Sequence, residues 1–264
     1  MTMSMSLILG AATVPSPRVR ALVIPREHGA WGMLLVPLTT GAAVGLMRGG
    51  RGLPLILFLL AAMAVFWLRT PLESWLGTTP LRAQSVAERR AVLAFIIPLS
   101  AVAALMFAAL FWGGHNLSLL PLGAIAMLAF VVQAGLKKLS RRLRMAAQVT
   151  GAIGLTAAAP AAYCVVTGRF DSTAAALWLA NWLFAGDQIH FVQLRIHAAR
   201  AQGAPEKLLR GRAFFAGQIG LAAVLIIAVK VGLLPWLALL AFAPILFRGI
   251  NWFLRDSQSL VVRR

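Results

Sequence analysis

Acidic residues and cysteine are both scarce in this chain. Its 264 residues include seven Asp and Glu and one cysteine, Cys164. A lone cysteine excludes an intrachain disulfide framework and a CxxC metal site. Charged residues of both signs make up only 12% of the chain, against roughly 25% in a soluble domain. The sequence therefore lacks the polar surface that a soluble globular protein of this size needs.

Long apolar runs take the place of that polar surface. Roughly 20 residues of helix cross the hydrocarbon core of a bilayer, and these runs are continuous rather than alternating, which favours helices over a barrel. We expect an all-α, polytopic helical membrane bundle in a single domain over residues 25–256, with loose cytoplasmic tails at 1–24 and 257–264. The eight predicted spans are 29–46, 53–68, 92–112, 117–136, 145–166, 173–194, 214–234 and 235–254.

Basic residues predict the orientation of the bundle. With these spans, 21 of the 25 Lys and Arg fall in the N-terminal tail, in the loops after the second, fourth and sixth spans, and at the C-terminal end. Cytoplasmic loops of membrane proteins collect basic residues, so both termini are predicted to be cytoplasmic. The same rule accounts for the net charge of +18 without a nucleic-acid partner. The four exceptions are Arg48, Arg51, Arg169 and Lys230.

The sixth predicted span carries most of the candidate functional residues. At about 100° per residue, Asn181, Gln188 and Arg195 share one stripe, while Asp187 lies one turn before His190. Polar groups on two faces exclude a lipid-facing helix, so this segment should be surrounded by protein or face a water-filled cleft. We assign Asp187 and His190 as candidate catalytic residues and the other three as substrate-binding. The alternative is an internal Asp187–His190 hydrogen bond with an interfacial arginine.

Two more candidate residues precede the first span. Glu27 and His28 come directly before Gly29. Glu27 is a candidate substrate-binding residue, although a carboxylate in the first turn also complements a helix dipole without further purpose. His28 has no such routine explanation, and it is a third candidate catalytic residue.

Arg69 and Glu73 form a third candidate group, just after the second span. Arg69 could bind an anionic headgroup through its fork of donors, and Glu73 would share that substrate-binding role. Alternatively, the two side chains pair with each other at i,i+4. Pro71 argues against a regular helix at this point.

Small residues predict which spans pack closely. Gly41 and Gly45 form a GxxxG motif in the first span, and Gly151 and Gly154 lie in the fifth. Such residues let helices approach in lipid, so we expect both spans to be central. An internal contact is favoured over a homo-oligomer formed through GxxxG. No HExxH or similar spacing points to a metal, and the sequence identifies no cofactor.

The string from Pro25 to Trp31, Pro-Arg-Glu-His-Gly-Ala-Trp, runs on into Met33-Leu-Leu-Val-Pro37. In this string, and in its size and hydropathy, the chain resembles the YwiC-like family of bacterial integral membrane proteins. The resemblance implies a multi-pass protein of the bacterial cytoplasmic (inner) membrane. It supplies no reaction, so whether the chain is an enzyme stays open.

The layout is also distantly similar to that of UbiA-type intramembrane prenyltransferases, which carry Asp-rich motifs after the second and sixth spans. At those places this chain has Glu73 and Asp187, one carboxylate each, which is too few to hold Mg²⁺ against a diphosphate. The similarity implies a cytoplasmic-side pocket for an anionic-headed lipid or isoprenoid, with Arg69 and Arg195 on the head. The alternatives are a small-metabolite or anion transporter and a non-catalytic membrane partner subunit.

Overall fold

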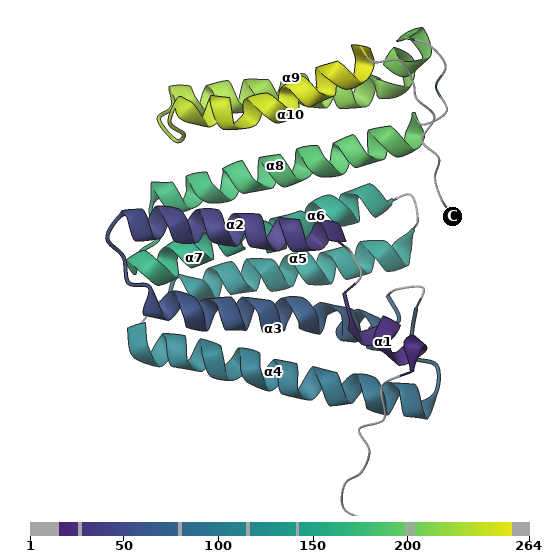
Figure 1. The fold of residues 1–264 in the computed structure, drawn as a ribbon, viewed down its shortest axis with the longest axis vertical. Coiled ribbons are helices and arrows are strands. Elements are labelled where there is room, and N and C mark those ends of the chain that lie inside the picture. The colour runs from purple at the N-terminus through teal and green to yellow at the C-terminus, as the bar shows by residue number, and fades with distance from the viewer. Residues whose placement is uncertain are drawn as a thin grey trace, which may run out of the picture. The chain divides into compact units, whose positions relative to one another are not determined.

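A computed structural model of the chain describes residues 16–25, 28–78, 81–114, 117–140, 143–198, 201 and 204–254. All regular secondary structure in these ranges is helical (Figure 1). The helices are α1 (Pro17–Val23), α2 (His28–Met47), α3 (Leu53–Leu76), α4 (Val86–Gly114), α5 (Leu119–Leu139), α6 (Arg144–Thr156), α7 (Ala158–Thr167), α8 (Ser172–His197), α9 (Ala204–Lys230) and α10 (Leu237–Leu254).

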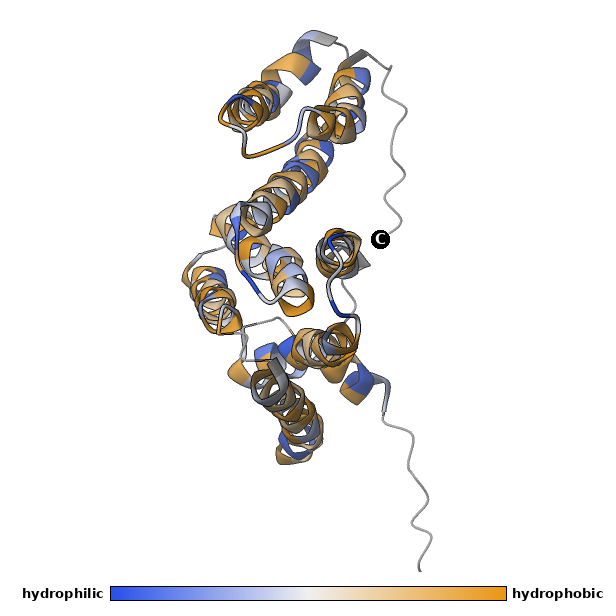
Figure 2. Cartoon of the chain, turned by 90° about the vertical axis from the view of Figure 1, so that its left-hand side faces the viewer, coloured by the Kyte–Doolittle hydropathy of each residue, from blue (hydrophilic) through white to orange (hydrophobic). Residues whose placement is uncertain are grey.

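Each predicted span coincides with a helix, and the fifth is divided between α6 and α7. Six helical segments are long and apolar enough to cross a membrane: α2, α3, α4, α5, the α6–α7 segment and α9. In Figure 2 the helices are coloured mostly orange, the colour of hydrophobic residues. Of the other two, α8 carries more polar residues and α10 is apolar but shorter. The described residues thus form the expected all-helical structure, with six candidate spans that indicate a multi-pass membrane protein, while the count of eight spans and the cytoplasmic termini stay predictions.

The described residues divide into two compact units. The first comprises residues up to His28 together with Leu60–Met106. In it, α1 begins after Ser16, whose hydroxyl accepts from the amide of Val19 at 3.3 Å. Leu22 is fully buried in a cluster with Val92, and the Leu22 carbonyl accepts from the Ser74 hydroxyl at 3.0 Å. A short helix therefore occupies part of the segment predicted to be a loose tail.

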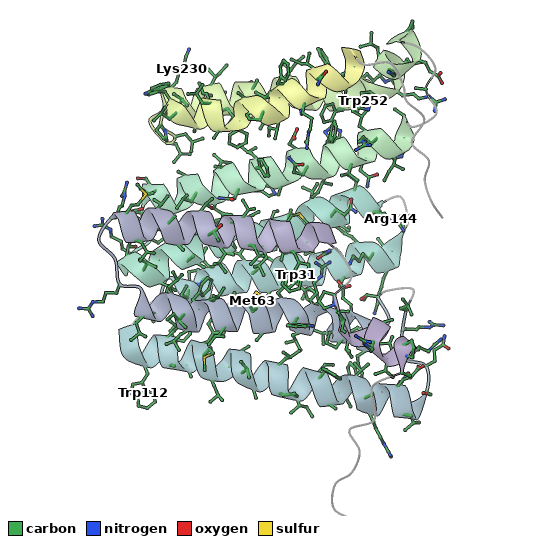
Figure 3. The ribbon with its side chains drawn as sticks, viewed as in Figure 1. Trp31, Met63, Trp112, Arg144, Lys230 and Trp252 are labelled. Atoms are coloured by element: carbon green, nitrogen blue, oxygen red, sulfur yellow. The ribbon has the colours of Figure 1, made fainter. Side chains whose placement is uncertain are left out.

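The second unit comprises Gly29–Leu59 and the chain from Phe107 onward. Its last two helices, α9 and α10, form an antiparallel hairpin, so Lys230 and Trp252 lie at opposite ends of it (Figure 3). The turn contains Gly232 at φ 73°, a left-handed conformation that suits glycine. Leu225 and Phe242 are buried in the cluster where the hairpin contacts α8.

Close glycine contacts set the positions of the central helices. A Cβ on Gly41 would lie 2.0 Å from the carbonyl oxygen of Ala159, so α2 touches the backbone of α7. A Cβ on Gly151 would likewise meet the Gln133 side chain of α5 at 2.6 Å. Of the six candidate spans, the α6–α7 segment is the most buried and α2 the second. The prediction that the first and fifth spans are central is confirmed, and the GxxxG motif serves a contact within the chain.

The fifth span contains a proline near its middle. α6 ends at Thr156, and α7 begins at Ala158 with Pro160 in its first turn. Proline lacks an N–H and its ring clashes with the carbonyl four residues earlier, here that of Thr156. The Thr156 hydroxyl instead donates to the carbonyl of Ala152 at 2.7 Å. Ala157, between the two helices, keeps a right-handed backbone, and its amide donates to the Ile153 carbonyl at 3.2 Å, so α6 and α7 form one span with a local irregularity before Pro160.

Candidate functional site

Polar side chains of α8 contact four neighbouring helices. Asn181 faces α2, where its amide donates to the Thr40 hydroxyl at 3.2 Å. Gln193 faces α6 and donates to Gln148 at 3.1 Å. Asp187 and Gln188 face the α9–α10 hairpin, as the next contacts show. These polar side chains therefore contact protein within the second unit, whereas Val192 and Ile196 of the same helix are exposed.

The main polar cluster is centred on Asp187. One carboxylate oxygen, Oδ1, accepts a short hydrogen bond from the side-chain amide of Gln218 on α9. The other, Oδ2, accepts from Nη2 of Arg248 on α10 at 3.1 Å. Nη1 of Arg248 donates to Oε1 of Gln188 at 2.8 Å. The guanidinium also lies 3.9 Å from the ring centroid of Phe191. Three helices thus meet around a single carboxylate, and we call these five residues the Asp187 cluster.

The Asp187 cluster lies deep in the helix bundle. Asp187 is ten residues before the end of α8, about 15 Å along a helix, and its side chain is 2% exposed. A charge removed from water at such a depth is strongly disfavoured unless it is paired and hydrogen-bonded. Arg248 supplies the opposite charge, and both carboxylate oxygens are satisfied. Nε of Arg248 and Oε1 of Gln218 are buried without a partner among the described residues.

His190 belongs to a different contact. Its ring packs edge-on against Phe214, with centroids 5.2 Å apart. On α9 the His190 ring leaves no room for a side chain at Gly217, where a Cβ would lie 2.9 Å from it. The carboxylate of Asp187 is directed to Gln218 and Arg248. An Asp187–His190 hydrogen bond, the structural alternative considered for this helix, is therefore not how that carboxylate is satisfied.

Arg195, Glu27 and His28 are not part of the Asp187 cluster. Arg195 is exposed in the last turn of α8. His28 begins α2, but its side chain lies outside the described residues, as does all of Glu27.

Arg69 and Glu73 lie on α3, in the first unit. Nε of Arg69 is 3.2 Å from Oε1 of Glu73, and both side chains are largely buried. α3 continues through Pro71 to Leu76, so the expectation that Pro71 prevents a regular helix is wrong. Membrane helices tolerate proline because neighbouring groups satisfy the freed backbone. Of the two interpretations of Arg69, the i,i+4 pair is the one that forms.

Sequence reasoning missed Arg248 as a partner. It counts among the basic residues of the C-terminal end, although it lies inside the predicted span 235–254 and inside α10. The signal was available, since an arginine inside an apolar span is costly enough to require a partner. The sequence could not identify that partner, because Asp187 is 61 positions from Arg248 along the chain.

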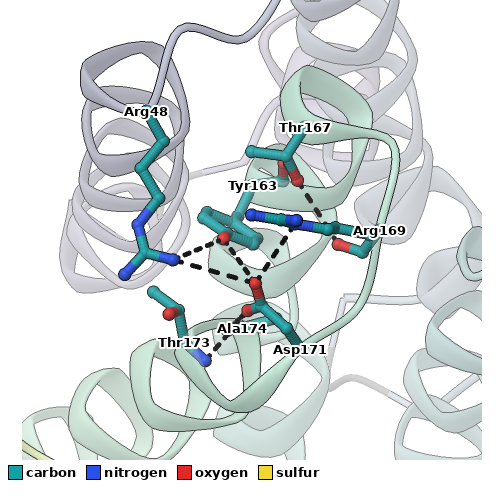
Figure 4. A network of polar contacts seen from close by, with 7 residues as sticks. All are labelled: Arg48, Tyr163, Thr167, Arg169, Asp171, Thr173 and Ala174. Carbon is teal, nitrogen blue, oxygen red and sulfur yellow. Dashed lines mark hydrogen bonds and ion pairs between the residues drawn. The ribbon is translucent and has the colours of Figure 1, made fainter.

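A second polar network, also missed, joins α2, α7 and α8 (Figure 4). Asp171 precedes α8 and caps it, accepting from the amides of Thr173 at 2.9 Å and Ala174 at 3.2 Å through Oδ1. Its Oδ2 accepts from the Tyr163 hydroxyl at 2.8 Å. Two guanidiniums approach that same oxygen, Arg169 through Nε at 3.4 Å and Arg48 through Nη1 at 3.8 Å.

These contacts stabilise the charged form of Asp171. Desolvation by itself would raise the pKa of this carboxyl group, but the opposing contributions are larger together. The Tyr163 hydroxyl and the two backbone amides donate to the carboxylate, and Arg169 adds positive charge nearby. The pKa of Asp171 is therefore lowered from its ordinary value.

No three His, Cys, Asp or Glu side chains lie close enough to hold a metal ion within the described ranges.

Comparison with known proteins assigns the family. The model of the YwiC-like protein family matches residues 24–163. This chain belongs to the YwiC-like family. The matched region contains Glu27, His28, Arg69 and Glu73 and stops before α8. No curated protein and no solved structure matches, so the similarity to UbiA-type enzymes is not borne out.

Proposed function

We propose that this YwiC-like protein is a membrane carrier for a small anionic solute, with the Asp187 cluster as its polar binding site. The observation that supports the proposal is the meeting of α8, α9 and α10 around one buried carboxylate. Ionisable groups at membrane depth are costly and typically mark substrate or ion pathways. Transport is the class of function for which polar groups at that depth on several helices are required.

The depth of the cluster favours a carrier over a protein that binds headgroups at the membrane surface. Asp187 lies ten residues before the end of α8, about 15 Å along the helix, which is farther from the helix end than a lipid headgroup ordinarily reaches. The α6–α7 segment also packs against α8 through Trp178, whose indole donates to the Ile153 carbonyl at 3.2 Å.

Arg248 is the residue that would hold the solute. The side chain of Arg248 is 35% exposed, while that of the paired Asp187 is 2% exposed, so the arginine is the more accessible partner for an incoming anion. A carboxylate or phosphate group on the solute would replace Asp187 as the acceptor. Gln188 and Gln218 would then keep the two charged side chains hydrogen-bonded while they are apart.

The test is electrical recording from proteoliposomes on a solid-supported membrane, with concentration jumps of succinate, lactate, glutamate and inorganic phosphate. We expect at least one of these anions to give a current that Arg248→Gln abolishes and Arg248→Lys reduces. The matched control is Arg144→Gln, which removes an exposed arginine at the start of α6. The absence of any Arg248-dependent current in monodisperse protein would reject the carrier.

A second candidate function rests on Arg195. This exposed arginine ends α8 on the side predicted to be cytoplasmic, a suitable place for the anionic head of a lipid or isoprenoid. In this alternative Asn181 and Gln188 would line the pocket. Native mass spectrometry decides it: the bound lipids should change in Arg195→Ala. An unchanged lipid profile excludes this role.

A further inference from the structure

Basic residues are rare on the side predicted to face away from the cytoplasm, and three of the four gather at one place. Arg169 lies in the turn between α7 and α8, and Arg48 directly follows α2. The backbone N–H of Arg51 donates to the Val166 carbonyl at 3.0 Å, which fastens the loop after α2 to the end of α7. Basic residues of membrane proteins collect on the cytoplasmic side, so a cluster of three arginines on the opposite side needs a physical reason.

Most of the hydrogen-bonding capacity of the two central arginines is unused by the network. Each guanidinium has five N–H donors. Arg48 approaches the network through Nη1, 3.3 Å from the Tyr163 hydroxyl, and Arg169 approaches it through Nε. The side chains are 47% and 66% exposed respectively. Their remaining donors are therefore accessible from outside the protein.

The network also holds excess positive charge in a fixed geometry. Two guanidiniums share one carboxylate, Asp171, whose Oδ1 is already used to cap α8. Tyr163 is fully buried and holds Oδ2 through its hydroxyl, so the carboxylate cannot turn to neutralise either arginine more fully. Two like charges that approach the same oxygen are stabilised when a second anion lies between them.

We propose that Arg48 and Arg169 form a binding site for a small oxyanion, either a free phosphate or carboxylate or the phosphate of a lipid headgroup. The anion would accept hydrogen bonds from the outer N–H groups of both arginines, beside Asp171 (Figure 4). Asp171 precedes Asp187 by sixteen residues, about 24 Å along α8. This site is therefore separate from the Asp187 cluster, and its existence does not depend on transport.

The experiment is isothermal titration of detergent-purified protein with inorganic phosphate. Arg48→Gln and Arg169→Gln should each weaken binding by about tenfold, the loss expected for one charge-assisted hydrogen-bonding partner. Lys230→Gln, which removes an exposed lysine on the same predicted side, should leave the affinity unchanged.

The decisive variant is Asp171→Asn. Asparagine caps helices as well as aspartate does, so α8 keeps its cap while the competing negative charge is lost. Phosphate should then bind several-fold more tightly than in the natural protein. A network with a purely structural role predicts no such gain. An Asp171→Asn affinity equal to or below that of the natural protein would overturn the site.

A parallel measurement separates the two sources of the anion. Nanodiscs containing phosphatidylcholine with phosphatidylglycerol are compared by native mass spectrometry for lipids retained by the natural protein, Arg48→Gln and Arg169→Gln. Selective loss of phosphatidylglycerol from both variants assigns the site to a headgroup, whereas arginine-dependent binding of phosphate alone assigns it to a free anion. If neither phosphate affinity nor lipid retention depends on the two arginines, the proposal fails.

Discussion

Replacing Gly41 with alanine would test the contact on which the centre of the second unit depends. The new methyl carbon would lie 2.0 Å from the carbonyl oxygen of Ala159, whereas ordinary contacts begin near 3.4 Å. The atom it meets is backbone, which cannot rotate away as a side chain could. The two helices, α2 and α7, would have to separate by about 1 Å or more.

The magnitude follows from two opposing effects. Alanine favours a helix over glycine by about 1 kcal/mol, and overpacking of this kind costs about 1–3 kcal/mol. Gly123→Ala is the matched control, because Gly123 is also inside a helix and a Cβ there would meet nothing within 4 Å. Helix propensity cancels between the two variants. Their difference in stability should therefore be about 1–3 kcal/mol, with Gly41→Ala the weaker.

The assay is thermal denaturation of the protein in detergent. The mass of the protein particle is measured separately, by light scattering after size-exclusion chromatography. At roughly 2–4 °C per kcal/mol for a chain of this size, Gly41→Ala should melt about 2–12 °C below Gly123→Ala at unchanged particle mass. Equal melting temperatures would refute the α2–α7 contact. A fall in particle mass would instead mean that the GxxxG motif joins two copies of the chain.

Three other predictions follow from the polar contacts and the topology. Arg248→Gln should destabilise the protein by about 3–5 kcal/mol because it leaves Asp187 buried and unpaired. The double variant Arg248→Gln with Asp187→Asn should recover part of that stability, and equal melting temperatures for the single and double variants would contradict this. The pKa of Asp171 is lowered in the folded state. The ionised Asp171 therefore stabilises the fold fully above its ordinary pKa near 4, and this stabilisation is lost as the pH falls through the folded-state pKa. The natural protein should melt above Asp171→Asn at pH 6, and this difference in melting temperature should shrink by pH 3. Reporter fusions after residues 75 and 205 should both report the cytoplasm, and opposite sides would refute the topology.

The helices were predictable from the sequence because their signal is local. Leu119–Leu139 is apolar along its whole length, and no partner elsewhere in the chain is needed to see that it suits a bilayer. Gly151 and Gly154 predicted a closely packed span, and the spacing of Arg69 and Glu73 offered their ion pair. The helix through Pro71 was not predictable, because the local rule for proline gives way when neighbouring groups satisfy the backbone.

The partners of the charged residues could not be predicted in the same way. The partner of Asp187 lies on another helix, and nothing in the residues near Arg248 indicates that its side chain turns inward rather than toward a headgroup. Nothing in the residues near Asp171 indicates that this carboxylate is the centre of a network with Tyr163 and Arg48. Such contacts depend on how helices rotate about their axes, which sequence periodicity constrains only weakly in lipid, where both faces of a helix are apolar.

The sequence by itself determined that this protein is a helical membrane protein of the YwiC-like family, since length, hydropathy and one short motif are properties of neighbouring residues. Only the tertiary structure decided that GxxxG packs within the chain and that Asp187 is neutralised by Arg248. The physical reason is that burial in a bilayer selects segments one at a time, whereas a buried charge is satisfied only by whichever distant side chain the packing brings within hydrogen-bonding distance.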